Sequence, residues 1–280
     1  MSQKSYDGQP VLYLIPTPIG NLEDMTYRAV NILKEVEVVF SEDTRVTAKL
    51  FQHFDIHKKL IANHEHNEEK NIKRCLEYLE AGCSIGVVSD RGTPVISDPG
   101  YSLASAAIAH GYHVVGLPGA TALIPALIQS GLSPKPFTFY GFLNQKSGKR
   151  KSELERLKDC DHTMIFYEAP HRITKMLQDM LTIFGNRAIS ISREISKRYE
   201  EVYRGVISEV ILQVNDVKGE LVVVVEGNHD VKTYDHLTIN EHVELYLKEG
   251  KELKEAMKIV AKKRNITKSQ VYNTYHQLDK

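Results

Sequence analysis

The chain has 280 residues, of which 42% are hydrophobic and 26% are charged, and its 36 basic and 36 acidic side chains give a formal net charge of +0. Such values are typical of a globular protein of two or three domains, and they exclude an overall basic surface for nucleic acid, so any such surface must be local. Three scattered cysteines are too few for a disulfide framework or a zinc site. Because no apolar run is long enough to span a membrane and the N-terminus lacks the apolar core of a signal peptide, we expect a cytoplasmic protein without membrane contact.

The first part of the chain alternates strands with helices. Short β-rich runs predict strands at 11–15, 36–40, 60–62, 85–88 and 113–117. Helical spacing of apolar residues predicts helices at 22–35, 47–54, 68–81, 101–110 and 122–129. This alternation predicts a mostly parallel sheet with helices on both faces, in a first α/β domain over residues 1–131.

A second α/β unit follows a short linker at 132–136. Strands are predicted at 137–140, 163–167, 188–192 and 221–226, and helices at 152–157, 173–184 and 208–214. The run LVVVVE at 221–226 is the most apolar strand of the chain, so we expect it at the centre of the second sheet. The fold class is therefore α/β, with two domains (1–131 and 132–228) built on mostly parallel sheets.

The tail, residues 236–280, changes to a helical pattern. Helices are predicted at 240–248, 253–262 and 268–278, with Thr267 as an N-cap. Helix, short turn and helix is the pattern of a helix-turn-helix domain, which often binds nucleic acid but also occurs as a plain helical hairpin.

Polar side chains that could do chemistry gather where the predicted strands end. The segment 84–100, SIGVVSDRGTPVISDPG, has a buried strand followed by two Ser-Asp pairs, and it is either a ligand-binding loop or an ordinary capped connection. The patterns GxGxxG, Walker A and GxSxG do not occur. A metal could bind His64, Glu65 and His66, but a polar loop is the better interpretation, and we expect no metal.

Six segments in order resemble one family. They are VLYLIPTPIGNLEDMTYRAVNILKEVEVVFSEDTR, NHEHNE, VVSDRGTPVISDPGYSL, LPGATAL, IFYEAPHR and REISKRYEEVYRG. The chain resembles the tetrapyrrole-methylase-type (class III) methyltransferases over residues 11–226, and more narrowly the branch that methylates the ribose 2′-hydroxyl of the decoding-centre cytidine 1402 of 16S rRNA. The resemblance implies a homodimer with S-adenosylmethionine held between the two α/β domains, acting on 16S rRNA or the 30S ribosomal subunit.

The resemblance also implies site residues. The cofactor contacts carried over are Pro16, Ser89, Asp90, Thr93, Ser97, Asp98, Pro99, Gly119, Ala120, Thr121, Tyr167 and Ala169. The family pattern of the central loop reads S-D-A-G-T-P-G-I-S-D-P-G, so Arg91 and Val95 replace a smaller alanine and glycine. The side chain of Arg91 therefore points either to the cofactor or outward to an RNA phosphate.

Methyl transfer to a ribose hydroxyl needs a group that accepts or shares the hydroxyl proton. The candidates at the strand ends are Glu42, Asp43, His64, His66 and Glu168, and we predict that Glu42 and His66 lie nearest the nucleophile. Phosphate contacts are predicted for basic side chains of the loops and the tail. They are Arg45, Lys146, Lys149, Arg150, Lys151, His171, Arg172, Lys262, Lys263 and Arg264, unless these form a merely solvated surface.

Two other functions remain open at the level of sequence. A protein of the same fold could methylate a tetrapyrrole, or a protein as diphthine synthase does. The basic tail argues against a tetrapyrrole, because binding so small a substrate does not require a phosphate-binding extension. The departures at Arg91 and Val95 also leave open a non-catalytic protein that binds RNA and senses S-adenosylmethionine.

Overall fold

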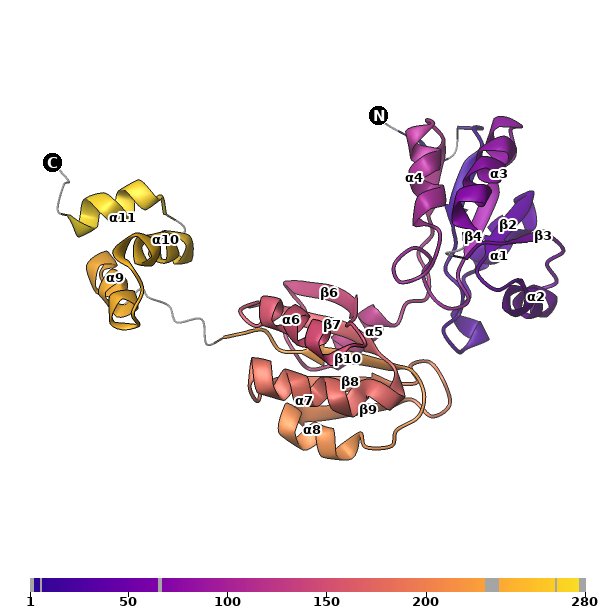
Figure 1. The fold of residues 1–280 in the computed structure, drawn as a ribbon. Coiled ribbons are helices and arrows are strands. Elements are labelled where there is room, and N and C mark those ends of the chain that lie inside the picture. The colour runs from indigo at the N-terminus through magenta and orange to yellow at the C-terminus, as the bar shows by residue number, and fades with distance from the viewer. Residues whose placement is uncertain (1–2, 6, 65–66, 230–236, 265, 277–280) are drawn as a thin grey trace. The chain divides into compact units, whose positions relative to one another are not determined.

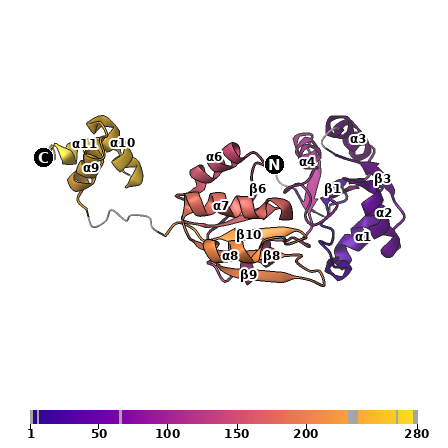
Figure 2. The same ribbon diagram turned by 60° about the horizontal axis from the view of Figure 1, so that its bottom comes forward.

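A computed structural model describes residues 3–5, 7–64, 67–229, 237–264 and 266–276 (Figures 1 and 2). Contacts between Cα atoms divide the chain into two compact units, Met1–Asn228 and His229–Lys280. The predicted boundary between the two α/β domains, at 131/132, lies inside the first unit and stays a prediction. Among the described residues no helix is both long enough and apolar enough to cross a membrane.

The first sheet of the larger unit is entirely parallel. Its strands are β1 (Val11–Leu14), β2 (Val38–Ser41), β3 (Lys59–Ala62), β4 (Ile85–Val88) and β5 (His113–Gly116), in the order β3-β2-β4-β1-β5. Parallel strands that are buried on both faces favour continuous apolar runs, as in β1 and β4, whereas the edge strands β3 and β5 are partly exposed. Their carboxyl ends meet at one edge of the sheet, where the predicted polar loops begin.

Helices cover both faces of this sheet. They are η1 (Leu22–Asp24), α1 (Tyr27–Glu35), α2 (Thr44–His53), α3 (Glu68–Glu80) and α4 (Tyr101–Ala109). One cluster joins Val11 and Tyr13 of β1 to α1 and α2, while the intervening Leu12 packs with α3 and α4. The alternation of β1 side chains between two buried faces explains why this strand is apolar at every position.

The second sheet is mixed. Its strands are β6 (Phe137–Phe142), β7 (Thr163–Glu168), β8 (Ala188–Arg193), β9 (Glu201–Val206) and β10 (Leu221–Val225), in the order β6-β7-β10-β8-β9. The predicted α/β class and the central position of β10 are confirmed, and all five β10 residues are buried. However, only β6 and β7 are parallel, because β10 runs antiparallel to both β7 and β8, and β9 antiparallel to β8.

Helices also cover both faces of the second sheet. They are α5 (Leu123–Gln129), α6 (Ser147–Leu157), η2 (Pro170–Arg172), α7 (Ile173–Phe184) and α8 (Ile207–Gln213). The largest core packs α6, α7 and α8 on one face, with Phe166 and Val223 at its centre. The opposite face is covered by α5, whose Ala126 and Leu127 pack against Val222 and Val224. Helix α5 thus follows the last strand of the first sheet but packs on the second.

The described residues of the smaller unit form a bundle of three helices. They are α9 (Ile239–Lys248), α10 (Leu253–Lys263) and α11 (Lys268–Tyr275). Reciprocal side-chain and backbone hydrogen bonds cap two of them, between Thr238 and Glu241 and between Thr267 and Gln270, so the predicted N-cap at Thr267 is confirmed. The core joins Val243 and Tyr246 of α9, Met257 and Val260 of α10, and Val271 of α11, so the three helices pack on one another.

Candidate active site

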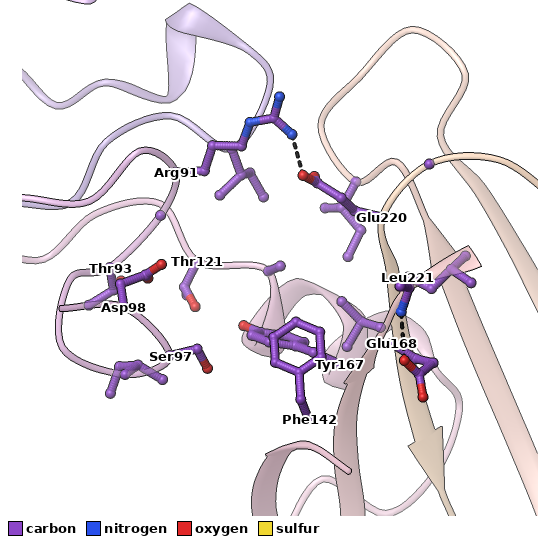
Figure 3. A pocket seen from close by; sticks show the side chains of 18 of the residues that line it. Arg91, Thr93, Ser97, Asp98, Thr121, Phe142, Tyr167, Glu168, Glu220 and Leu221 are labelled. Carbon is purple, nitrogen blue, oxygen red and sulfur yellow. Dashed lines mark hydrogen bonds and ion pairs between the residues drawn. The ribbon is translucent and has the colours of Figure 1, made fainter. Parts of the chain in front are cut away.

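A cavity of about 370 Å³ lies in the larger unit, between loops of the two sheets (Figure 3). From the first sheet it is lined by Ile19, Arg91, Gly92, Thr93, Ile96, Ser97, Asp98, Thr121 and Ala122. From the second sheet it is lined by Phe142, Tyr167, Glu168, Ala169, Pro170, Ile195, Gly219, Glu220, Leu221 and Val222. A concave apolar site with a few convergent polar groups has the form of a small-molecule site, and its size lies in the usual range.

The loop after β4 forms one wall of this cavity. Backbone hydrogen bonds of 2.9 Å in both directions join Gly92 to Thr17 of the loop after β1, and the Thr93 hydroxyl donates to the carbonyl of Ala120 at 3.1 Å. Val95 has a φ of +79°, a left-handed conformation that strongly favours glycine. The loop therefore holds a valine in a conformation suited to glycine, at a cost of about 1–3 kcal/mol in strain.

The predicted cofactor residues divide into two groups. Those in the cavity wall are Thr93, Ser97, Asp98, Thr121, Tyr167 and Ala169. Those behind the wall are Pro16, Ser89, Asp90, Pro99, Gly119 and Ala120. The second group builds the loops: Ser89 is buried and donates to the carbonyl of Gly92 at 3.1 Å, and Asp90 accepts from the amide of Asp43 at 3.0 Å. Cofactor contact by either group stays a prediction.

Gly119 shows why the loop after β5 needs glycine. A Cβ atom at this position would lie 2.7 Å from the Cβ of Pro16, closer than such atoms approach in proteins. The loops after β1 and β5 can therefore meet only because position 119 has no side chain. This contact supports the wall that Thr121 and Ala122 complete.

Asp98 is the acidic group of the first wall. Burial, together with the nearby carboxylates of Glu42 and Asp90, raises the pKa of Asp98 to about 6. Tyr167 faces it from the second wall, with a side-chain hydrogen bond to Thr121 and a pKa raised mainly by burial. Three carboxylates near one end of the cavity make it attractive for a cationic ligand.

Glu168 is the acidic group of the second wall. Its side chain is 0% exposed, and its Oε1 accepts the Ala169 amide at 2.8 Å. The Nε of Arg172 lies 3.1 Å from the same oxygen, but at an angle that is not a hydrogen bond. Its Oε2 has no hydrogen-bond partner among the residues that the structure describes, and burial raises the pKa of this carboxyl.

The predicted catalytic residues Glu42, Asp43 and His64 are not among the residues that line the cavity. Glu42 follows β2 and is close enough to Asp98 to raise the pKa of that group. Asp43 caps α2, and its hydrogen bonds with Arg45 lower its pKa to about 2. The backbone of His64 donates to the side chain of Asn67, and His66 lies outside the described residues. Their catalytic roles stay predictions.

The predicted RNA-binding residues also differ in how accessible they are. Lys146, Lys149, Lys151, His171, Lys262 and Lys263 are exposed. The Arg45 guanidinium is exposed and pairs with Asp43 at 2.6 Å. Three other guanidinium groups are engaged within the fold. Arg150 is buried against Asp179 at 2.7 Å, Arg172 donates to the carbonyl of Leu143, and Arg264 donates to the carbonyl of Leu237.

An ion-pair network crosses the mouth of the cavity. Arg91 of the first wall pairs with Glu220 of the second, as Figure 3 shows, and Lys197 donates to the other oxygen of Glu220 at 3.0 Å. Lys197 also pairs with Glu194 at 2.8 Å. Arg91, left open between cofactor and RNA by the sequence, thus joins the two walls.

Sequence reasoning missed much of the second wall. Phe142, Ile195 and residues 219–222 line the cavity without any polar motif that marks them in the sequence. Among the described residues no group of three or more His, Cys, Asp or Glu side chains is placed to hold a metal ion. The metal alternative at 64–66 lies partly outside the described residues.

Comparisons with known proteins agree with this architecture. Residues 11–211 match the family model described as tetrapyrrole (corrin/porphyrin) methylases. Among solved structures, a uroporphyrin-III-C-methyltransferase of Thermus thermophilus has a TM-score of 0.57 at 17% identity, covering 78% of this chain and 94% of that one. The methyltransferase CobJ has a TM-score of 0.59 at 19% identity, covering 79% and 95%. These two likenesses confirm the fold.

The full-length relatives are more similar in sequence. The ribosomal RNA small subunit methyltransferase I of Bacillus subtilis is 47% identical over 98% of this chain and 98% of its own length. The protein of the same name from Streptococcus pyogenes is 42% identical over 99% of both chains. The chain therefore belongs to the tetrapyrrole (corrin/porphyrin) methylase family, within which its sequence groups with the small subunit ribosomal RNA methyltransferases I.

Proposed function

We propose that this protein transfers a methyl group from S-adenosylmethionine to the ribose 2′-hydroxyl of a cytidine in 16S rRNA, at the decoding-centre position 1402. The observation that carries the proposal is the 47% identity, over 98% of the chain, to a protein named ribosomal RNA small subunit methyltransferase I. The ribose specificity and the position rest on the motif resemblance of the six segments.

The cavity residues fit S-adenosylmethionine. Ile96, Ile195 and Val222 offer apolar surface for an adenine ring, and the hydroxyls of Thr93 and Thr121 offer polar partners. The carboxylate of Asp98 suits the positive charge of a sulfonium or an amino group. A related uroporphyrin-III C-methyltransferase of Thermus thermophilus has been solved in complex with S-adenyl homocysteine.

The charge of Asp98 gives a test of this fit. We expect Asp98→Asn to weaken S-adenosylmethionine binding by at least roughly tenfold, because one lost charge-assisted contact is worth about 1.5–3 kcal/mol. The same change should stabilise the ligand-free protein at pH 7, since the raised pKa means that the folded state resists ionisation of this carboxyl. In the wild type, protonated Asp98 contributes its full share to the free energy of unfolding below the unfolded-state pKa of about 3.8. This contribution is lost as the pH rises through the folded-state pKa of about 6.

Calorimetric titration with S-adenosylmethionine and urea unfolding between pH about 4 and 8 measure the two effects. Ser97→Ala is the matched control, because Ser97 lines the same cavity but does not titrate. We expect the stability gain of Asp98→Asn to grow with pH to about 1–3 kcal/mol, and that of Ser97→Ala to be independent of pH. Unchanged affinity in Asp98→Asn would show that this carboxylate does not face the cofactor.

When bound, S-adenosylmethionine supplies a methyl group on a sulfonium sulfur, which leaves as the neutral thioether of S-adenosylhomocysteine. The protein has to position the ribose hydroxyl in line with that methyl group and to accept the hydroxyl proton. We propose Glu168 as the first candidate for the acceptor, because it is the predicted catalytic residue that lies in the cavity wall and its pKa is raised; its buried carboxylate would have to become exposed to the ribose when substrate binds. Asp43 is a weaker base, since its pKa is lowered to about 2.

RNA binding is proposed to use the exposed lysines of both units. Lys146, Lys149 and Lys151 gather at the start of α6, and Lys262 and Lys263 end α10. Phosphate contacts by such side chains release counterions, so RNA affinity should fall steeply with salt. A protein that acts on ribosomal subunits works in the cytoplasm, and we propose that it does so as a homodimer, for which exposed apolar side chains such as Ile128 and Leu212 are available.

One assay tests the activity. The protein is incubated with methyl-labelled S-adenosylmethionine and, separately, 30S subunits, naked 16S rRNA and tetrapyrrole precursors. We expect label in the RNA, recovered as 2′-O-methylcytidine after digestion to nucleosides. Label in a tetrapyrrole or in a base would contradict the proposal, and cofactor binding without any transfer would favour a non-catalytic sensor.

A further inference from the structure

The loop after β8 carries both a residue that lines the cavity and an exposed aromatic ring. In this loop, residues 194–200, Ile195 lines the cavity, whereas the side chain of Tyr199 is 69% exposed. The guanidinium carbon of Arg198 lies 5.7 Å from the centre of the Tyr199 ring. An exposed ring with a guanidinium beside it is how proteins commonly hold unpaired bases of single-stranded RNA.

We propose that Tyr199 and Arg198 form a stacking platform for one unpaired base of the RNA substrate, next to the nucleotide that is methylated. The inference rests on the proposed function, because it assumes that the cavity accepts a nucleotide of RNA. The occupant is a nucleobase, stacked on the phenol ring, with its neighbouring phosphate near Arg198.

Backbone hydrogen bonds hold this loop in one conformation. Glu194 and Ser196 both have left-handed φ angles, of +53° and +68°, which non-glycine residues adopt only where the surroundings fix them. The amide of Lys197 donates to the carbonyl of Glu194 at 3.0 Å, and the amide of Glu200 to that of Lys197 at 3.1 Å. The Ser196 amide donates to the Glu200 carboxylate at 2.8 Å. A ring presented by a pre-formed loop binds with little loss of conformational entropy.

The charges of the loop favour RNA over an apolar partner. Lys197 is neutralised by Glu194 and Glu220, at 2.8 and 3.0 Å. Arg198 is exposed, and it has no ion pair within the described ranges of the chain. Its uncompensated positive charge beside the ring suits a phosphate next to a stacked base.

The platform and the cavity are linked through the same loop. Tyr199 follows Ile195 by four residues, which limits the backbone separation to about 14 Å. Lys197, between them, pairs with Glu220, a residue of the second wall of the cavity. The base on Tyr199 therefore belongs to a nucleotide near the target, and stacking it would help to place the ribose at the cavity.

A single-tryptophan variant tests the contact directly. The chain contains no tryptophan, so Tyr199→Trp creates one fluorophore at the platform. Titration of the full-length protein with a short single-stranded RNA of the decoding-centre sequence should quench its emission. Tyr27→Trp is the matched control, because the side chain of Tyr27 is 93% exposed at the start of α1, where no base contact is expected. Equal quenching in both variants, or in neither, would overturn the proposal.

A double-mutant cycle between ring and base gives the second test. We expect Tyr199→Ala to weaken binding of the same RNA by about 5- to 150-fold, the range that corresponds to the loss of one stacked base, and Tyr199→Phe to keep the affinity. Replacing the bases one by one with abasic nucleotides should reveal one position whose loss weakens wild-type binding but not that of Tyr199→Ala.

Three outcomes decide between the ring and other causes. The proposal is overturned if, at every abasic position, the loss of RNA affinity simply adds to the loss caused by Tyr199→Ala. It is also overturned if a Tyr199→Ala variant with the wild-type melting temperature binds RNA with unchanged affinity. A dimer that dissociates in Tyr199→Ala while RNA affinity is kept assigns the ring to a contact between copies of the chain, and also overturns it. Binding that depends on Tyr199 without methyl transfer by the wild type would contradict the proposed function alone.

Discussion

We expect Glu168→Gln to lower the single-turnover rate of methyl transfer by about 10²- to 10⁴-fold, the usual contribution of a general base. Glutamine keeps the size of the side chain and can still accept the Ala169 amide hydrogen bond, but it cannot take the proton of the ribose hydroxyl. The raised pKa of Glu168, caused mainly by burial, brings this base closer to the working pH than an exposed glutamate would be.

The pH dependence separates a base from a merely structural residue. A base must be ionised, so the wild-type rate should rise with pH through a pKa above the ordinary value of glutamate, and this limb should be absent in Glu168→Gln. Quench-flow measurements with bound cofactor and saturating RNA report the rate, and the melting temperature reports folding.

Alanine variants of the other predicted bases complete the comparison. Glu42→Ala and His66→Ala test the prediction that these two residues lie nearest the nucleophile. If Glu42→Ala or His66→Ala removes the pH limb while Glu168→Gln keeps a wild-type rate, the proton acceptor is not Glu168. If Glu168→Gln lowers the rate but the rate still rises with pH as in the wild type, Glu168 positions the substrate and does not accept the proton.

The first wall of the cavity was largely predictable, because the parallel strands of an α/β sheet all end at the same edge. Alternating strands and helices predict a parallel sheet, and its carboxyl edge predicts that loops with Thr93, Asp98 and Thr121 converge. The sequence does not tell which residues of a loop face inward. Ser89 and Ser97 each precede an aspartate, yet Ser89 is buried in the loop and Ser97 lines the cavity.

The second wall was less predictable, because the second sheet is mixed. Leu221, the first residue of β10, pairs with Glu168 and Arg193 at the ends of β7 and β8. The start of an antiparallel strand thus reaches the edge where its neighbours end. A search confined to strand ends finds Tyr167 and Glu168 but overlooks Glu220 and Val222. Strand β9, which follows β8 without a crossover helix between them, was not predicted from its local sequence EVYRGV.

Basic residues in a run also look alike in sequence but differ in the fold. In the segment GKRK at 148–151, the side chain of Arg150 is 5% exposed and that of Lys151 is 52% exposed. Helix α6 turns Arg150 toward α7, where Asp179 accepts a hydrogen bond from its Nε at 2.7 Å and forms an ion pair with a terminal nitrogen at 2.7 Å. Helical geometry thus separates neighbours that charge alone groups together, and phosphate contact by Arg150 would require this buried pair to break.

Removing one member of that pair should be costly to stability. We expect Asp179→Ala to lower the free energy of unfolding by about 3–5 kcal/mol, because it leaves the buried guanidinium of Arg150 without its anion. The double variant Arg150→Met with Asp179→Leu should recover most of this loss, since apolar side chains of similar length can fill the space between α6 and α7. Lys149→Ala, an exposed neighbour, should change stability by less than about 0.5 kcal/mol.

Urea unfolding measures these stabilities, and the salt dependence of RNA binding measures the phosphate contacts of the same variants. Lys149→Ala should reduce the slope of log affinity against log salt by about 0.7–0.9, the value for one phosphate contact, and should leave the free energy of unfolding unchanged. The Arg150→Met and Asp179→Leu double variant should keep the wild-type slope, because the buried guanidinium makes no phosphate contact. A lower slope of log affinity against log salt in the folded double variant would show that Arg150 leaves Asp179 to bind RNA. An Asp179→Ala protein with the wild-type free energy of unfolding would show that water reaches the ion pair.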